Sequence, residues 1–265
     1  MDTKIEDESR ESSLCHLYER PISPLKKQDW TAIRRMTTEE CGEPLVPMDT
    51  MPEVLINHPE YYIQGLKGSL PVCYARLSVF KKILKAAELL PKGYKFVVLD
   101  AWRPIEVQQF LYDQFKSIVR ERHPEIKDED KITEMTTQFV GLPSLDYNKP
   151  GGHNAGGAVD LTIADENGIW LDMGTCFDET TDRTVTRYYE EKLESGDHLS
   201  EREIGICKNR RLLYHIMIKV GFTNYTEEWW HYDFGDLLWA AYTDGKVKAI
   251  YSRVTPTFAW HKISE

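Results

Sequence analysis

The chain has 265 residues, of which 41% are hydrophobic, and its 33 Lys and Arg against 43 Asp and Glu give a formal charge of −10. This length and apolar content allow a sizeable core and argue against a disordered chain. The acidic balance argues against a nucleic-acid or anionic-membrane surface, which would need clustered Lys and Arg.

The N-terminal region predicts neither export nor a membrane anchor. Residues 1–20 form a polar lead-in, whose first stretch "MDTKIEDESRESS" lacks the apolar core of a signal peptide. We expect residues 21–265 to fold as a single domain. No apolar run reaches the ~18 residues of a membrane span, and the five scattered cysteines contain no CxxC pair. These features predict a cytoplasmic protein with neither nucleic acid nor membrane as a partner.

Helices and one buried strand are predicted in the first half of the domain. The stretch 73–91, "CYARLSVFKKILKAAELLP", has helical spacing and ends at a proline. Its apolar face is formed by Leu77, Phe80, Ile83, Leu84 and Ala87. "YKFVVLDAW" (94–102) is typical of a buried strand, rich in Val and aromatic residues. Pro104 then opens a helix to residue 122, and a weaker helical pattern lies near 128–140.

Strands, an acidic segment and a long helix are predicted in the second half. "GAVDLTI" (157–163) and "GIWLDM" (168–173) indicate a strand pair around a turn, and 222–234 is aromatic and strand-like. The acidic segment 178–198 is expected to be a surface excursion, as a lid or a subunit contact. Together the elements predict an α+β fold with a small antiparallel sheet flanked by helices.

The long helix of the second half has clear start and stop signals. Ser200 and Glu203 form a capping box that would begin the helix "EREIGICKNRRLLYHIMIKV". Gly221 stands at its stop position, where a left-handed residue commonly ends a helix.

The glycine-rich stretch "GGHNAGGAVDLTI" could place two metal ligands together. Imidazole nitrogen and carboxylate oxygen both bind zinc at ~2.0–2.2 Å. Seven extended residues would span roughly 23 Å, so the chain between His153 and Asp160 must reverse direction to bring them to one ion. Gly156 and Gly157 permit such a reversal, because glycine tolerates positive φ. The alternative is a turn that leaves both side chains in solvent.

The stretch "EEWWHYDF" could add a third ligand and a proton acceptor. His231 offers an imidazole, and Glu228 could take a proton from a metal-bound water. Their spacing of three places them on one face of a helical turn. On a regular strand they would face opposite sides, so a loop or bulge would be needed. The alternative is a core histidine among aromatic side chains, with Glu228 in solvent.

Arg103 follows the buried strand "KFVVLDAW" directly. The rigid end of a strand suits a catalytic group, and a guanidinium there could stabilise an oxyanion formed at a carbonyl. The alternative is a surface arginine paired with Asp100.

Four blocks occur together between about residues 75 and 235: "DAWRP", "HNAGGAVDLT", "MGTCFD" and "EWWHYDF". Together they resemble the zinc D-alanyl-D-alanine dipeptidases associated with vancomycin resistance. More broadly, they are similar to the D,D-peptidase superfamily, which shares its fold with the hedgehog signalling domain. The resemblance implies one Zn²⁺ per chain, bound by His153, Asp160 and His231 in a cavity over the sheet. It also implies that Glu228 is the catalytic glutamate and Arg103 an active-site arginine.

The resemblance also implies how the substrate is bound. The aspartate of the "MGTCFD" block, Asp178, is expected to bind the substrate's amino terminus. The family motif reads Ser-x-His-x-x-Gly-x-Ala-x-Asp, and here Gly151 replaces the substrate-binding serine. We therefore expect hydrolysis of a small dipeptide, D-alanyl-D-alanine, in cell-wall precursor metabolism or glycopeptide resistance, with the dipeptide preference open. The alternatives are another dipeptide, a D,D-carboxypeptidase or endolysin acting on longer peptidoglycan peptides, and a non-catalytic zinc-binding interaction domain.

Overall fold

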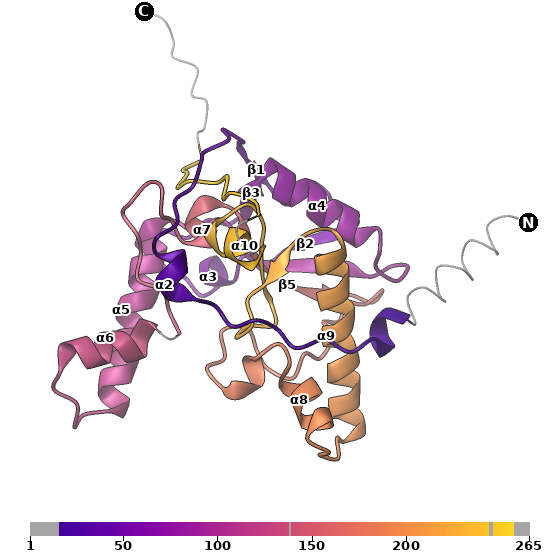
Figure 1. Ribbon diagram of the computed structural model, residues 1–265. Helices are drawn as coiled ribbons and strands as arrows, with labels where there is room; N and C mark the ends of the chain where they lie inside the picture. Colours follow the sequence, from indigo (N-terminus) through magenta and orange to yellow (C-terminus); the bar gives the residue numbers. More distant parts are fainter. Residues whose placement is uncertain (1–15, 138, 244–245, 257–265) are drawn as a thin grey trace, which may run out of the picture.

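A five-stranded sheet lies at the centre of the computed structural model, which describes residues 16–137, 139–243 and 246–256 (Figure 1). The strand order is β2-β4-β5-β7-β6, and a second, two-stranded sheet pairs β1 with β3. The strands are β1 Leu45–Pro47, β2 Leu55–Asn57, β3 Tyr74–Arg76, β4 Lys95–Asp100, β5 Ala158–Ala164, β6 Thr223–Asn224 and β7 His231–Asp233. The predicted α+β class is confirmed. The main sheet is mixed, however, because β2 runs parallel to β4 while the other neighbours are antiparallel.

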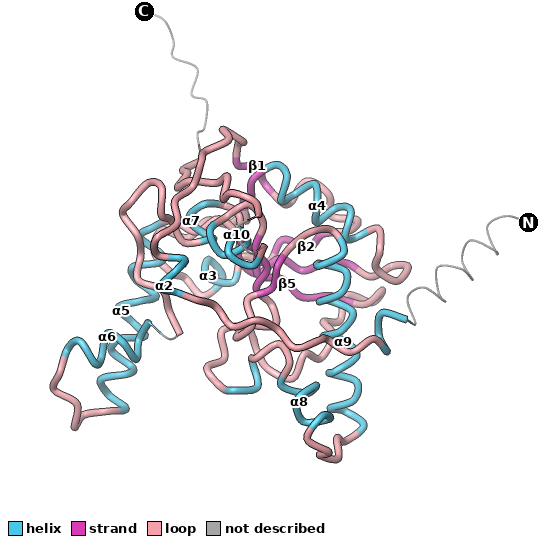
Figure 2. Tube along the Cα trace, in the orientation of Figure 1, coloured by secondary structure: helices cyan, strands magenta, loops and turns pink. Residues whose placement is uncertain are grey.

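Helices surround this sheet, and loops make up much of the rest (Figure 2). They are α2 Trp30–Ile33, α3 Glu60–Ile63, α4 Leu77–Ala87, α5 Ile105–Arg122, α6 Glu129–Thr137, α7 Gly152–Ala155, α8 Tyr188–Glu194, α9 Glu201–Lys219 and α10 Leu237–Tyr242, with a 3₁₀ turn η1 at Asp182–Thr184. None of the helices in the described ranges is both long and apolar enough to cross a membrane. Most of the predicted lead-in, residues 1–15, lies outside the described residues.

The elements with clear local signals lie where the sequence predicts them. The buried strand is β4, and the helices after it are α5 and α6. The capping box begins α9, with Ser200 accepting a hydrogen bond from the Glu203 amide, and Gly221 follows its end at φ +96°. The predicted helix over 73–91 is shorter, because Tyr74–Arg76 pairs with β1 before α4 begins.

One predicted element is wrong, and a second is only partly correct. The strand expected at 168–173 makes only an isolated bridge between Ala164 and Trp170. The acidic segment 178–198 is only partly a surface excursion: residues 180–183 and 193–198 are exposed, but α8 packs against α9 (Figure 2). Glu190 of α8 is buried and accepts two hydrogen bonds of 2.7 Å from Arg211 of α9. The negative charge of this segment is therefore partly neutralised inside the protein.

Side-chain alternation gives the sheet two different faces. Leu161 of β5 and Tyr232 of β7 belong to the main core with residues of α4 and α9, which contact one another. Val97, Leu99 and Ala164 form a smaller cluster on the other face. This second face also carries the alternate, polar positions of β5 and β7. The polar side chains described next therefore lie opposite the main core.

Candidate functional site

Three neighbouring strands align polar residues in one row across the sheet. In the ladder, Asp160 of β5 pairs with His231 of β7 on one side and Asp100 of β4 on the other. A register shift lies between Val98 and Asp100. Such a bulge turns one extra residue toward the partner strand. It brings Asp100 beside Asp160, although regular alternation would place Asp100 on the core face.

His153 reaches the same row from the short helix α7. The helix ends at Gly156, whose φ is +73°, and the chain then enters β5. A Cβ at Gly156 would lie 2.6 Å from Leu45 Cδ2, so a side chain there meets both backbone strain and a clash. The predicted glycine-dependent reversal between His153 and Asp160 is confirmed.

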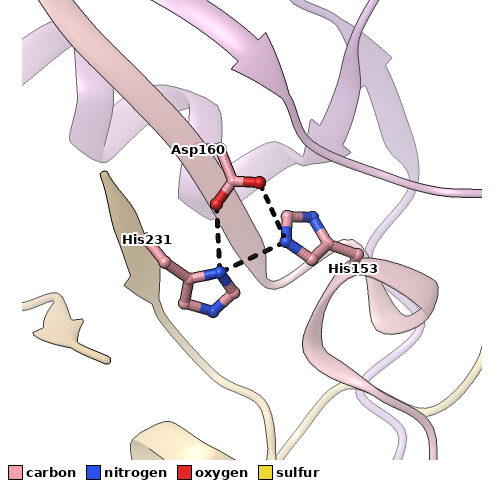
Figure 3. A group of neighbouring side chains, drawn as sticks. All are labelled: His153, Asp160 and His231. Atoms are coloured by element: carbon pink, nitrogen blue, oxygen red, sulfur yellow. Dashed lines mark hydrogen bonds and ion pairs between the residues drawn. The ribbon is translucent and has the colours of Figure 1, made fainter. Parts of the chain in front are cut away.

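The side chains of His153, Asp160 and His231 converge (Figure 3). Asp160 Oδ2 lies 3.3 Å from His153 Nε2, and Asp160 Oδ1 lies 3.0 Å from His231 Nδ1. The two imidazole nitrogens are 3.3 Å apart, and one ligand atom from each residue lies within 4.8 Å of the others. Two nitrogens and a carboxylate oxygen in this arrangement fit a single metal ion.

Hydrogen bonds on the far side of each ring fix which nitrogen faces this centre. His153 Nδ1 donates to the Ala101 carbonyl at 2.6 Å, which leaves Nε2 toward Asp160. His231 Nε2 donates to Asp233 Oδ1 at 2.9 Å, which leaves Nδ1 toward Asp160. Metal-binding histidines characteristically have such outer partners, which orient the ring and raise its basicity. The tautomers required for metal binding are therefore built into the fold.

A second buried carboxyl group stands behind Asp233. Burial and the adjacent Asp233 raise the pKa of Asp236 well above its ordinary value, so Asp236 stays protonated. Neither Asp233 Oδ2 nor Asp236 Oδ2 has another hydrogen-bond partner in the described chain. A protonated Asp236 can donate a hydrogen bond to Asp233.

Asp160 and His231 at this centre carry opposite charges that balance each other. Burial opposes ionisation of Asp160, but His153 and His231 hold its pKa well below the ordinary value. Burial alone would lower the pKa of His231, but Asp233 and Asp160 raise it well above normal. In the absence of metal, a proton on His231 Nδ1 therefore compensates Asp160. A metal ion would replace that proton.

Glu228 lies in the turn before β7, with Oε2 3.7 Å from His231 Nδ1. A regular strand would send residues 228 and 231 to opposite faces. The turn brings both to one site, as the predicted loop or bulge would. The Glu228 side chain is 26% exposed, against 3% for Asp160. Burial raises the pKa of Glu228 to about 8, although His231 acts against that shift. The carboxyl group can therefore hold or release a proton near neutral pH.

Arg103 is buried beside this centre and is not on the surface. It pairs with Asp100, as the alternative interpretation predicted, and its Nη2 lies 2.8 Å from Asp100 Oδ2. The same Nη2 lies 3.8 Å from Asp160 Oδ2. Its Nη1 donates to Gln108 Oε1 at 2.8 Å. Burial alone would lower the pKa of Arg103, but Tyr61 and the nearby carboxylates raise it above its ordinary value. A fixed positive charge therefore adjoins the three predicted ligands.

Asp178 lies on the same side of the site as Arg103. Its backbone has φ +58°, in the left-handed region that non-glycine residues rarely adopt. Its carboxylate accepts a 2.7 Å hydrogen bond from the Tyr61 hydroxyl. Burial raises the pKa of Asp178 to about 6, even though Tyr61 and Arg103 lower it. A backbone strained in this way and a carboxyl group with a raised pKa together indicate a functional position.

Gly151 is the N-cap of α7, with φ −67°, and it is exposed. A Cβ there would be in ordinary contact, 3.4 Å from Asn154 Oδ1. The backbone therefore does not require glycine at this position. A serine would fit, so the missing hydroxyl is a difference in site chemistry alone.

Sequence reasoning missed several residues of the site. Asp233 follows His231 by two, so strand alternation could have placed it on the same face. Tyr61 and Gln108 had no such signal, because α3 and α5 reach the site only through the tertiary fold. The position of the site in a cavity stays a prediction.

Comparisons with known proteins agree with this geometry. The sequence model of a family described as D-ala-D-ala dipeptidase matches residues 71–252. A D-alanyl-D-alanine dipeptidase of Synechocystis sp. is 32% identical over 236 residues, which is 82% of this chain and 94% of that protein. Proteins of the same name from Escherichia coli and Enterococcus faecium are 29% and 28% identical over 59% and 57% of this chain, and over 63% and 68% of their own lengths.

Proposed function

The chain belongs to the D-Ala-D-Ala dipeptidase family of metallopeptidases, and from this premise we propose that it uses one zinc ion to hydrolyse free D-alanyl-D-alanine to two molecules of D-alanine. The observation that carries the proposal is the placement of a carboxylate and a guanidinium beside a three-residue metal centre. Glu228 lies 3.7 Å from His231, and Arg103 lies 3.8 Å from Asp160. A purely structural metal site would need neither group.

The donor set supports zinc as the metal. His153 Nε2, His231 Nδ1 and one Asp160 oxygen would hold it. Catalytic zinc sites typically have three protein ligands and leave one position for water or substrate. When bound, the ion would supply a Lewis acid for the peptide carbonyl and its attacking water.

The protein's own residues would carry the remaining chemistry. Glu228 accepts a proton from the attacking water and later returns it to the departing amine of the second alanine. Arg103 places positive charge beside the carbonyl oxygen as negative charge develops on it. Its pairing with Asp100 and Gln108 holds the guanidinium in place, so little reorganisation is needed when the carbonyl is attacked.

Asp178 would bind the ammonium group of the first alanine. Its carboxylate has one hydrogen bond from Tyr61 and retains acceptor capacity for a ligand. Such a subsite favours short peptides with a free amino terminus over peptides joined to peptidoglycan. Gly151 places no side chain at the start of α7. The preference for the second residue of the substrate must therefore be measured.

A cytoplasmic location and a role with cell-wall precursors are part of the same proposal. The support for a reducing compartment is that the four cysteines within the described ranges, Cys41, Cys73, Cys176 and Cys207, are free thiols. Cell-wall recycling, the use of D-alanine as a nutrient and glycopeptide resistance would all depend on this same hydrolysis of D-Ala-D-Ala.

The test is hydrolysis by the zinc-loaded protein of D-Ala-D-Ala, with L-Ala-L-Ala and N-acetyl-D-Ala-D-Ala in parallel. We expect rapid cleavage of the free D,D-dipeptide alone. Equal cleavage of the acetylated substrate would contradict an ammonium subsite and favour a carboxypeptidase. Zinc binding without cleavage of any of the three would favour a binding domain.

The charge of Asp178 predicts how substrate affinity depends on pH. Its pKa is raised to about 6, so the carboxylate is charged above pH 6 and becomes neutral below it. The dipeptide's ammonium, with a pKa of ~8, stays charged in that range. We therefore expect KM for D-Ala-D-Ala to rise about tenfold per pH unit below 6. Initial rates at saturating zinc between pH 4.5 and 8 measure this rise in KM, which forms the acid limb of the pH profile. Asp178→Asn should abolish it.

A further inference from the structure

The hydroxyl of Tyr61 lies between the two groups proposed to hold the first residue of the substrate. It is 2.7 Å from Asp178 Oδ2 and 3.3 Å from Arg103 Nη2. The Arg103 guanidinium also stands over the Tyr61 ring, 4.9 Å from its centroid. Tyr61 belongs to α3 and is only 5% exposed. One buried side chain therefore contacts both groups.

The direction of both hydrogen bonds is determined by the chemistry of the partners. A guanidinium can only donate, so the phenol oxygen accepts from Arg103. The phenol's single proton is then left for the Asp178 carboxylate. Burial raises the pKa of Tyr61 well above its ordinary value, although Arg103 acts against that shift, so the proton stays on the hydroxyl. The result is a directed chain from Arg103 through Tyr61 to Asp178.

Asp178 depends on this contact for its orientation. No other hydrogen-bond donor in the described ranges reaches its carboxylate. The neighbouring Phe177 packs against the Tyr61 ring at 5.8 Å and against Trp230 at 5.4 Å. The backbone before Asp178 is thus anchored by ring packing, while its carboxylate is aimed by a single hydroxyl.

We propose that Tyr61 is a positioning residue that sets the specificity of the site for an α-amino peptide. This inference rests on the proposed dipeptidase function. In such a substrate the ammonium nitrogen and the carbonyl oxygen of the first residue are only three bonds apart. The groups that bind them must therefore keep a fixed separation, and the Tyr61 hydroxyl bridges Asp178 to Arg103 in the way this requires. A β-amino peptide does not match that separation, and an N-acylated peptide keeps the separation but lacks the ammonium charge.

The main test compares Tyr61→Phe with Tyr62→Phe, which alters the adjacent but 50% exposed tyrosine. We expect Tyr61→Phe to raise KM for D-Ala-D-Ala about tenfold while kcat changes less than threefold, because a hydrogen bond to a charged group is lost. Tyr62→Phe should leave both unchanged. Unchanged KM in Tyr61→Phe, or a loss confined to kcat, would overturn the proposal.

The pH profile separates positioning from mere structural support. The groups that face Asp178 are Tyr61, Arg103, Asp100, Asp160 and, across the site, Glu228. Of these, Tyr61 and Arg103 favour the charged carboxylate. Without the hydroxyl, the acid limb of KM should move to higher pH. A Tyr61→Phe variant with the wild-type limb would contradict the proposed contact.

A double-mutant cycle guards against an indirect effect of Tyr61→Phe on folding. Because Tyr61 acts through Asp178, its substitution should change KM by less than twofold in an Asp178→Asn background. A further tenfold rise in KM in the Asp178→Asn background would show that Tyr61 acts elsewhere and would overturn the proposal.

Binding of D-alaninamide keeps this proposal separable from the proposed function. This ligand has an ammonium and an amide carbonyl three bonds apart and requires no turnover. Calorimetry with the zinc-loaded protein should give about tenfold weaker binding to Tyr61→Phe than to wild type. Equal binding to both would overturn the role of Tyr61, whereas absence of D-Ala-D-Ala cleavage by wild type would overturn the function alone.

Discussion

Replacement of Glu228 by glutamine is expected to lower kcat by ~10²–10⁴-fold while zinc remains bound. This range is typical for removal of a general acid–base group. Glutamine keeps the size of the side chain but cannot take the proton of the attacking water. The metal ligands are unchanged, because Glu228 lies 3.7 Å from His231 Nδ1 and belongs to the turn before β7.

The measurement is kcat for D-Ala-D-Ala together with the zinc content of the purified variant. Glu227→Gln is the matched control, since it makes the same change one residue earlier, where the side chain contacts the Thr226 hydroxyl at 3.4 Å. Near-normal turnover in Glu228→Gln would show that Glu228 is not the base. Loss of zinc along with turnover would instead make Glu228 a ligand.

The three candidate metal ligands could be found from the sequence because their signals are local. A glycine-dependent reversal links His153 to Asp160 within one short stretch. Predicting that Asp160 and His231 lie side by side requires knowledge of the strand pairing, because the two residues meet through the pairing of β5 with β7. Their common face follows once the strands are paired, because directly opposed residues point the same way.

The groups that tune the site were missed because their contacts span the fold. Tyr61 reaches Asp178 across a separation of 117 residues, and no local periodicity predicts such a pair. Asp100 faces Asp160 only because a bulge interrupts β4. Such irregularities concentrate beside functional sites, and a pattern that assumes a regular strand sends that carboxylate to the wrong face.

Composition also misled the interpretation of residues 178–198. An acidic segment is usually solvated, but here the buried Glu190 is compensated by an arginine from elsewhere in the chain. Arg211 of α9 binds Glu190, whereas Arg187, which belongs to the segment itself, donates to the Ile22 carbonyl at 2.9 Å. The segment, which begins at Asp178, is part of the packed framework of the protein.

Asp160→Asn is expected to lower zinc affinity at least ~100-fold and to abolish measurable turnover at micromolar zinc. Substitution of an outer partner of a metal ligand already costs about 10–100-fold in affinity, and this change removes a ligand's charge. The amide keeps the shape of the side chain, so the fold should persist. Asp197→Asn, at an exposed acidic position, is the control.

Thermal unfolding with and without zinc measures the loss of zinc affinity directly. At a zinc concentration of 100 Kd, binding stabilises the wild type by about 2.7 kcal/mol, which for a protein of this size raises Tm by roughly 5–10 °C. Asp160→Asn should show almost no zinc-dependent shift, while Asp197→Asn should match wild type. If Asp160→Asn kept both zinc and turnover, the third ligand would have to be another carboxylate near His231 Nδ1. Glu228 is the residue at that distance, and a glutamate bound to the metal could not also serve as the base. The two substitutions therefore test each other.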